Sequence, residues 1–305
     1  MHPAIAYVDC SDLMHEMLRQ EWPDHETRMK VHVGDMPASD LVDYCKDANW
    51  LWNGHTMMPA GFLSQLPHLK RILFLGSGPA SYIDMQYCAK AGIAVDRITE
   101  YGDRAVAEHA LALLFAASRQ VAGMDRALRA GHWEPLEGLE LGGRRLGLIG
   151  FGGIGRSLAG MARALGMELA IWNRSALPRE WADCAAELDD LLAASDFVSL
   201  HLSLNPQTRG FLSAGRIARM RPGAILVNTA RAGLVDTAAL IHALGTGHLR
   251  HAALDVFDTE PLPPDDPLLS VPNLTLTTHA GFKTREATQR LMRAAIAMVQ
   301  ETEGR

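Results

Sequence analysis

A glycine-rich segment near the middle of the chain has residue types and spacing suited to binding a phosphate group. It matches G-x-G-x-x-G with Gly150, Gly152, Gly153, Ile154 and Gly155. The segment follows an apolar run at 145–149 and opens a helical stretch at 154–165, the context that a dinucleotide-binding turn requires. Glycines permit a tight turn and a close backbone approach, and the helix N-terminus presents unpaired N–H groups to an anion. The sequence therefore predicts a pyrophosphate site, although glycines at this spacing also form ordinary turns.

The residues at the end of the following apolar run bear on the choice of dinucleotide. An NAD site usually has Asp or Glu there, about 20 residues after the glycines, to bind the ribose 2′-hydroxyl. This chain has Asn173, Arg174 and Ser175 instead. Asn173 removes a carboxylate that would repel a 2′-phosphate, while Arg174 can bind that phosphate with two N–H groups and Ser175 can donate a hydrogen bond. The pattern favours NADP, with NAD as the alternative and a solvated surface arginine as the plain reading of Arg174.

The elements that must position these residues alternate between short apolar runs and stretches of helical spacing. The runs lie at 5–8, 29–33, 50–52 and 71–75, and then at 145–149, 169–172, 197–201, 225–228, 252–255 and 274–277. Strands joined through helices must lie parallel. The predicted fold class is therefore α/β, with two doubly wound parallel-sheet domains.

Two further segments stand out between and after these runs. The stretch at 104–119 is rich in Ala and Leu without Gly or Pro, which predicts a helix too apolar to face solvent. We expect it at a domain junction, followed by an irregular arm at 131–143 that contains Trp133. After Thr284 a final amphipathic helix is expected to run to about residue 301 and to return to the first domain.

Composition limits the classes of partner. The 305 residues carry a net charge of -6 without a long Lys or Arg run, so neither a nucleic-acid footprint nor a polybasic membrane patch is present. The N-terminus lacks the pattern of a signal peptide and no apolar stretch reaches membrane length. The scattered Cys10, Cys45, Cys88 and Cys184 suggest neither a metal site nor a disulfide framework. We expect a cytoplasmic protein with a small-molecule partner.

Several further motifs follow one another in a fixed order. They are GSG at 76–78 with YID at 82–84, VAEH at 106–109, NTARAGLVD at 228–236, DVF at 255–257 followed by Glu260-Pro261, and THAG at 278–281. With the glycine loop, they make nearly the whole chain resemble the D-isomer-specific 2-hydroxyacid dehydrogenase family, which includes glyoxylate and hydroxypyruvate reductases. The resemblance implies a flavodoxin-like substrate domain at 1–98 plus 283–305, an NAD(P)-binding Rossmann domain at 99–282, and a cleft between them.

The resemblance also implies an active site made of Arg231, Glu260 and His279. Hydride delivery to a 2-keto carbon leaves negative charge on its oxygen, so a protonated His279 can donate a proton there, and oxidation reverses the step. Glu260, hydrogen-bonded to the second ring nitrogen, would favour the charged imidazole and fix its orientation. Arg231 offers a planar fork to the substrate carboxylate and keto oxygen. Singly, each has a plain alternative: a surface glutamate, an arginine in an ion pair, or a core histidine.

Other residues implied by the resemblance form two groups. Those expected near the nicotinamide are Thr229, Ala230, Arg231, Asp255, His279 and Gly281. Those expected to bind substrate are Asn53, Gly54, His55, Gly76, Ser77 and Gly78, through their N–H groups, with Arg231 and His279. The first-domain segments could equally be plain turns, and a strand-end aspartate is often a helix cap. Thr278 and Ser203 replace prolines common in the family, which we expect to shift loops without removing a reacting group.

The leading prediction is an enzyme that reduces a 2-keto acid of the glyoxylate or hydroxypyruvate type with NADPH. One alternative is a nucleotide-sensing corepressor or scaffold of the same fold, which the complete set of three active-site residues disfavours. Phosphoglycerate dehydrogenase is less favoured because the sequence ends soon after its last helix, and formate or phosphite dehydrogenase are further alternatives. We also expect a homodimer, because the apolar helix and the arm reach a partner subunit in relatives.

Overall fold

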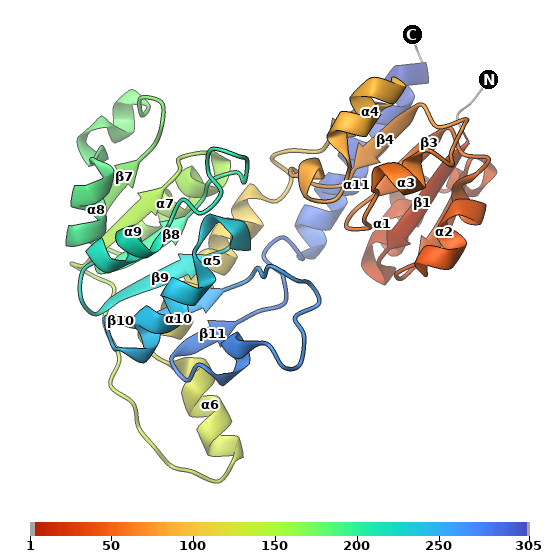
Figure 1. The fold of residues 1–305 in the computed structure, drawn as a ribbon. Helices are drawn as coiled ribbons and strands as arrows, with labels where there is room; N and C mark the ends of the chain where they lie inside the picture. The colour runs from red at the N-terminus through yellow and green to blue at the C-terminus, as the bar shows by residue number, and fades with distance from the viewer. Residues whose placement is uncertain (1–3, 304–305) are drawn as a thin grey trace. The chain divides into compact units, whose positions relative to one another are not determined.

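The computed structural model describes residues 4–303, which fold into two compact units (Figure 1). The segments up to Gly102 and from Lys283 onward form unit 1, and Asp103–Phe282 form unit 2. Each unit is built on one parallel sheet, so the predicted fold class of two parallel-sheet α/β domains is confirmed. The functional division at residues 98 and 282 stays a prediction, since the units are defined by packing alone.

Unit 1 has a five-stranded sheet in the order β2-β1-β3-β4-β5, with every pair parallel. Its strands are β1 (Ile5–Cys10), β2 (Met29–Val33), β3 (Trp50–Asn53), β4 (Arg71–Phe74) and β5 (Ala94–Arg97). Its helices are α1 (Asp12–Glu21), α2 (Ala38–Cys45), α3 (Ala60–Leu63), α4 (Met85–Ala91) and α11 (Arg285–Glu303). This is the flavodoxin-like strand order, in which ligands bind beyond the carboxyl ends of the strands.

The buried interior strand β1 explains why helices lie on both sides of the unit 1 sheet. All six residues of β1 are buried, as expected for a parallel strand covered on both faces. The last helix, α11, packs against α1 near the start of the chain. Arg285 pairs with Glu16 and Arg293 with Glu21 along this contact. Two segments far apart in the sequence therefore complete one layer of unit 1 (Figure 1).

Unit 2 has a six-stranded parallel sheet in the order β11-β10-β9-β8-β6-β7. Its strands are β6 (Arg145–Ile149), β7 (Glu168–Trp172), β8 (Phe197–Leu200), β9 (Ala224–Asn228), β10 (Leu249–Leu254) and β11 (Leu274–Leu276). Its helices are α5 (Asp103–Ser118), α6 (Val121–Arg129), α7 (Gly153–Ala164), α8 (Leu188–Ala194), α9 (Ala214–Arg219) and α10 (Thr237–Gly245). A parallel bridge between Ile171 and Ala185 extends the sheet beyond β7, which completes the Rossmann order on that side.

Two apolar cores lie on the two faces of the unit 2 sheet. Helices α5 and α7 pack on each other and bring Leu114 and Leu158 into one core. Helices α8, α9 and α10 supply the other core, with Leu192 and Leu240. The apolar stretch predicted as a buried helix is α5, which opens unit 2 (Figure 1). Within residues 4–303, no helix is both long and apolar enough to cross a membrane.

Candidate active site

The glycine loop joins β6 to α7 with the geometry that its sequence predicts. Gly150 has a φ of +98°, and a Cβ there would lie 2.5 Å from the carbonyl oxygen of His201. A Cβ at Gly155 would lie 2.5 Å from the carbonyl oxygen of Gly150, so the helix can approach the strand only with glycine at this position. A Cβ at Gly152 would meet nothing within 4 Å. The loop is therefore tightly packed on one side and open at Gly152.

The open side of the loop fits a dinucleotide. The first N–H groups of α7 have no intrahelical acceptor, and the N-cap residue Gly152 has no side chain to bond them. A phosphate at this end would meet both these donors and the positive end of the helix dipole. Elsewhere in unit 2, the buried hydroxyl of Thr229 has no hydrogen-bond partner in the described part of the chain. An unsatisfied buried hydroxyl beside a predicted cofactor segment is what a bound ligand would resolve.

The three residues after β7 have different surroundings. The amide oxygen of Asn173 accepts the Phe151 N–H at 3.1 Å, and its nitrogen donates to the carbonyl and hydroxyl oxygens of Ser175, both at 3.0 Å. Asn173 therefore ties the turn to the glycine loop. Arg174 is exposed and has no hydrogen-bond or ion-pair partner among residues 4–303, and it lines an open hollow. Glu187 and Asp190 line the same hollow, so its charge is mixed.

Glu260 and His279 form a hydrogen-bonded pair. His279 Nδ1 lies 2.6 Å from Glu260 Oε2, and the two side chains are 26% and 30% exposed. The other carboxylate oxygen of Glu260 accepts the N–H of Phe257 at 2.9 Å. Burial raises the pKa of the Glu260 carboxyl, but the hydrogen bonds from His279 and Phe257 and the charge of Arg231 outweigh it, so the pKa lies below its usual value. Glu260 is therefore a carboxylate near neutral pH.

The backbone at His279 adopts a conformation that needs support. Its φ is +50°, a left-handed value that is uncommon for residues other than glycine. The carboxylate of Asp255 accepts the next two N–H groups, of Ala280 and Gly281, each at 2.9 Å. It also accepts the hydroxyl of Thr277 at 2.6 Å. Asp255 thus holds both sides of His279, rather than capping a helix as its plain reading suggested.

Arg231 lies on a turn that follows β9. The side chain of Asn228 accepts the Ala230 N–H at 3.0 Å and donates to the carbonyl oxygen of Arg231 at 2.9 Å. The guanidinium donates to the carbonyl oxygen of Ala230 at 2.6 Å, and its charge reaches Glu260, where it helps to lower the carboxyl pKa. Since β9, β10 and β11 are adjacent and parallel, their carboxyl ends bring Arg231, Glu260 and His279 to the same edge of the sheet.

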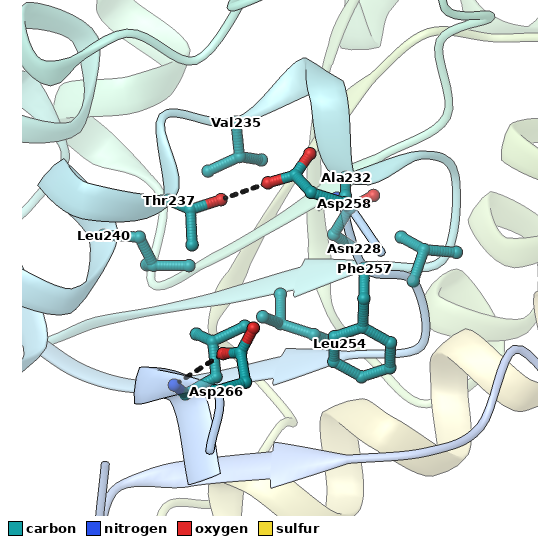
Figure 2. Close-up of a pocket in the computed structure, with 11 residues that line it drawn as sticks. Asn228, Ala232, Val235, Thr237, Leu240, Leu254, Phe257, Asp258 and Asp266 are labelled. Carbon is teal, nitrogen blue, oxygen red and sulfur yellow. Dashed lines mark hydrogen bonds between the residues drawn. The ribbon is translucent and has the colours of Figure 1, made fainter. Parts of the chain in front are cut away.

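A small cavity lies behind this edge (Figure 2). Its volume is about 40 Å³, and Asn228, Ala232 and Phe257 are among the residues that line it. Figure 2 shows Thr237 joined to Asp258 by a hydrogen bond, which measures 3.2 Å. Ligand pockets are usually about 300 to 1,000 Å³, so this cavity is a packing space rather than a substrate site. It lies next to the segments that carry Arg231 and Glu260.

The two substrate segments predicted in unit 1 differ in their free donors. The N–H groups of Gly54 and His55 donate to the buried carboxylate of Asp9, at 2.9 and 2.7 Å, and the Asn53 side chain bonds the backbone of Thr56. These groups are already engaged. Asp9 was not among the residues predicted from the sequence, although its position near the end of an apolar strand was a signal for such a role.

The segment after β4 leaves donors free. Gly76 N–H donates to the Phe74 carbonyl oxygen at 2.9 Å. The N–H groups of Ser77 and Gly78 have no acceptor within the described residues. Of the two predicted substrate segments, only 76–78 therefore retains unbonded N–H groups. No group of three or more His, Cys, Asp or Glu residues within 4–303 is arranged to hold a metal ion.

Most of unit 2 matches a known family of protein domains. A family profile described as "D-isomer specific 2-hydroxyacid dehydrogenase, NAD binding domain" matches residues 111–281. The matched part contains the glycine loop, Arg231, Glu260 and His279. Unit 2 is thus a nicotinamide-dinucleotide-binding Rossmann domain.

Individual relatives extend the match beyond this domain. The chain is 36% identical over 280 residues to D-3-phosphoglycerate dehydrogenase of Mycobacterium leprae, covering 90% of this chain and 51% of that protein. It is also 36% identical to a glyoxylate reductase of Aeropyrum pernix, covering 88% and 84%. A solved structure of a Thermus thermophilus protein matches with a TM-score of 0.84 at 33% identity, covering 98% and 97%. The chain belongs to the D-isomer specific 2-hydroxyacid dehydrogenase family, a family of oxidoreductases, and spans about half the length of the phosphoglycerate dehydrogenases it matches.

Proposed function

We propose that the protein reduces a small 2-keto acid of the glyoxylate or hydroxypyruvate type at C2, using NADPH. The observation that carries the proposal is the bonded pair of Glu260 and His279 with the charge of Arg231 nearby. The cofactor supplies the hydride. The protein's own residues then have to bind the acid, orient it and provide a proton to the developing alkoxide.

His279 is the residue that we propose supplies the proton. Its Nδ1 is bonded to Glu260, while Nε2 makes no hydrogen bond within residues 4–303. The Glu260 carboxylate stabilises the positive imidazolium and fixes the ring, so Nε2 is the atom that donates to the substrate oxygen. In the oxidising direction the same nitrogen accepts the hydroxyl proton.

Arg231 is proposed to bind the substrate carboxylate and keto oxygen. A guanidinium presents two parallel N–H donors that match a carboxylate. In the substrate domain, proposed as 1–98 with 283–305, the free N–H groups of Ser77 and Gly78 are candidate donors to the same carboxylate. The Rossmann domain is proposed as 99–282. In the cofactor site, we propose that Thr229, Ala230, Asp255 and Gly281 lie near the nicotinamide.

The preference for NADPH rests on the residues after β7. A carboxylate that would repel a 2′-phosphate is absent at Asn173, and Arg174 is an exposed cation without a partner among the described residues. Ser175 can still donate from its hydroxyl, which only accepts from Asn173. Glu187 and Asp190 line the same hollow and oppose this preference, so their charges set how strong it is.

We further propose a homodimer formed through α6 and the arm that follows it. Trp133 is 84% exposed, and Val121 and Leu128 are also large exposed apolar residues in this region. Three large exposed apolar side chains within the short segment 121–133 are what a subunit interface would bury. A cytoplasmic location stays a prediction from the sequence.

The proposed reaction is tested by a screen of NADPH oxidation. Glyoxylate, hydroxypyruvate, pyruvate, phenylpyruvate and branched 2-keto acids are compared, and 3-phosphoglycerate is assayed in the oxidising direction because several relatives are phosphoglycerate dehydrogenases. We expect turnover of glyoxylate or hydroxypyruvate, with a loss of roughly 10²- to 10⁴-fold in kcat for His279→Ala. His68→Ala, at an exposed position, is the control.

Two results would contradict the proposal. Turnover of 3-phosphoglycerate alone would contradict the proposed substrate class but not the proposed active site. NADPH binding with no turnover of any acid would favour a nucleotide-sensing corepressor or scaffold.

A further inference from the structure

His109 on α5 contacts the segment that carries His279. Its Nε2 lies 3.0 Å from the hydroxyl of Thr277 and 3.3 Å from Asp255 Oδ1, and its side chain is 22% exposed. The ring also lies beside Gly281, which follows His279 in the sequence as Thr277 precedes it. A Cβ built at Gly281 would lie 3.6 Å from His109 Cδ2. One side chain of a long helix therefore contacts a loop 168 residues later in the sequence.

Asp255 links His109 to His279. Its carboxylate is bonded to Thr277 on one side of His279 and to the N–H groups of Ala280 and Gly281 on the other. Burial raises the pKa of this carboxyl, but the hydrogen bonds from His109, Thr277 and the two N–H groups outweigh burial and lower it. The carboxylate is thus stabilised by donors from both the loop and α5.

The rigidity of α5 makes His109 a useful anchor. The helix runs over 16 residues, and its buried face packs on α7 and on β9, β10 and β11. The loop, in contrast, carries a left-handed His279 that is uncommon for a residue with a Cβ. A loop in such a conformation keeps it only where the surrounding structure holds it.

We propose that His109 is a positioning residue for proton transfer, which holds the 277–281 segment through Asp255 and Thr277 and so aims the His279 ring. This inference rests on the proposed function of His279 as the proton donor. His109 itself touches neither substrate nor cofactor in this scheme. Its loss would leave the glycine loop intact but let the proton donor move, and a displacement of about 1 Å at a reacting group can lower a rate by about 100-fold.

The test compares three variants of the full-length protein. His109→Leu removes the donor, His109→Gln keeps a nitrogen donor near the Nε2 position, and Glu108→Gln changes the neighbouring exposed residue as a control. We expect kcat to fall about 10- to 100-fold in His109→Leu, with most of the activity retained in His109→Gln. The NADPH affinity, measured by fluorescence titration, should change less than about threefold, because the pyrophosphate site is in the glycine loop.

Some outcomes overturn the inference while leaving the proposed function standing. A kcat of His109→Leu equal to that of the wild type would do so, as would equal losses in His109→Leu and His109→Gln. If His109→Leu does not fold, Thr277→Val breaks the same network from the loop, and a wild-type kcat in that variant rejects the inference.

Failure of the proposed function is recognised separately. If the wild type turns over no acid, histidine NMR of the NADPH-bound protein reads the position of His279 directly. Loss of the strongly hydrogen-bonded Nδ1 signal in His109→Leu, but not in Glu108→Gln, would support the positioning role. An unchanged signal in His109→Leu would reject it.

Discussion

The charge state of Glu260 governs what the proposed proton donor can do. Its hydrogen bonds to His279 and Phe257 keep the carboxyl ionised although it is partly buried. An ionised carboxylate beside an imidazole favours the protonated ring. The pairing thus fits a site that reduces a carbonyl near neutral pH.

Replacing Glu260 by Gln should alter both rate and pH dependence. The Glu260 carboxylate can stabilise a positive ring only while it is ionised, and its pKa lies below the usual value. The wild type should therefore lose activity only at acid pH, where Glu260 takes up a proton, and the Gln variant should lack this acid-side loss. We expect kcat to fall about 10- to 100-fold near neutral pH. The measurement is kcat against pH, with Glu180→Gln as the exposed control. A wild-type profile in Glu260→Gln would rule out this role.

Arg174→Ala tests the cofactor preference. A charge-assisted hydrogen bond is worth roughly 1.5 to 3 kcal/mol, so kcat/KM for NADPH should drop about 10- to 100-fold while that for NADH changes little. Arg179→Ala, also exposed and five residues further on, should leave both unchanged. Equal losses with the two cofactors would contradict a contact to the 2′-phosphate.

The order of the motifs indicated which strands precede the candidate active-site residues. The hydrogen bonds of individual side chains could not be predicted from the sequence. The sequence placed Arg231, Glu260 and His279 after strands that prove adjacent. It did not show that the Asn173 amide forms hydrogen bonds with Phe151 and Ser175. Nor could it show Asp9 bonding a loop 45 residues away, since that contact depends on β1 and β3 lying side by side.

At the scale of elements, the contact between β6 and α7 leaves no room for an added side-chain atom at Gly155. Gly155→Ala would place a Cβ against the carbonyl oxygen of Gly150, a backbone atom that cannot rotate away. We expect a lower Tm and a loss of NADPH affinity of tenfold or more. Gly160→Ala on the same helix meets nothing within 4 Å and should stabilise the protein by up to about 1 kcal/mol. Thermal unfolding and NADPH titration of both variants check this, and unchanged affinity in Gly155→Ala would contradict it.

The elements that the sequence missed are those with weak apolar patterns. The strand β5 was not predicted because its residues, Ala94–Arg97, are exposed or only partly buried at the edge of the sheet. The helix α6 has no fully buried residue. Its sequence therefore lacks the strong apolar run that would have predicted it. By contrast, all six strands of unit 2 coincide with predicted runs, because three to six mostly apolar residues in sequence are a strong signal.

For the whole molecule, a buried histidine makes stability depend on pH. His251 is 3% exposed, and burial, together with the charges of Arg126 and Arg250, lowers its pKa to about 4. The unfolded chain binds this proton near pH 6.5, whereas the folded protein does not, so the free energy of unfolding should decrease as pH falls from 6.5 to 4. Between pH 7 and 5 the loss is about 2 kcal/mol.

His251→Gln should remove this loss, because glutamine keeps a polar group near Thr275 but does not titrate. Denaturant unfolding at pH 7 and pH 5 gives the measurement, with His68→Gln as the exposed control. If His251→Gln retains the full wild-type pH dependence, His251 is not its source.

The proposed dimer is also a property of the whole molecule. Replacing Leu128 and Trp133 by Asp puts charges on the exposed apolar surface, and light scattering should then give the mass of one chain where the wild type gives two. Lys46→Asp, at an exposed site in unit 1, should not change the mass. A monomeric wild type at micromolar concentration would contradict the proposal.

The return of α11 to α1 has a consequence for synthesis on the ribosome. The residues of unit 1 are split by the whole of unit 2, so the buried Leu291, Met292 and Val299 of α11 reach the first layer only after all of unit 2 has been translated. Until then Met17 and Leu18 of α1, both buried in the finished protein, lack that cover. The inserted unit can therefore mature first, and the first segment of unit 1 must wait for α11 before it is protected from misassembly.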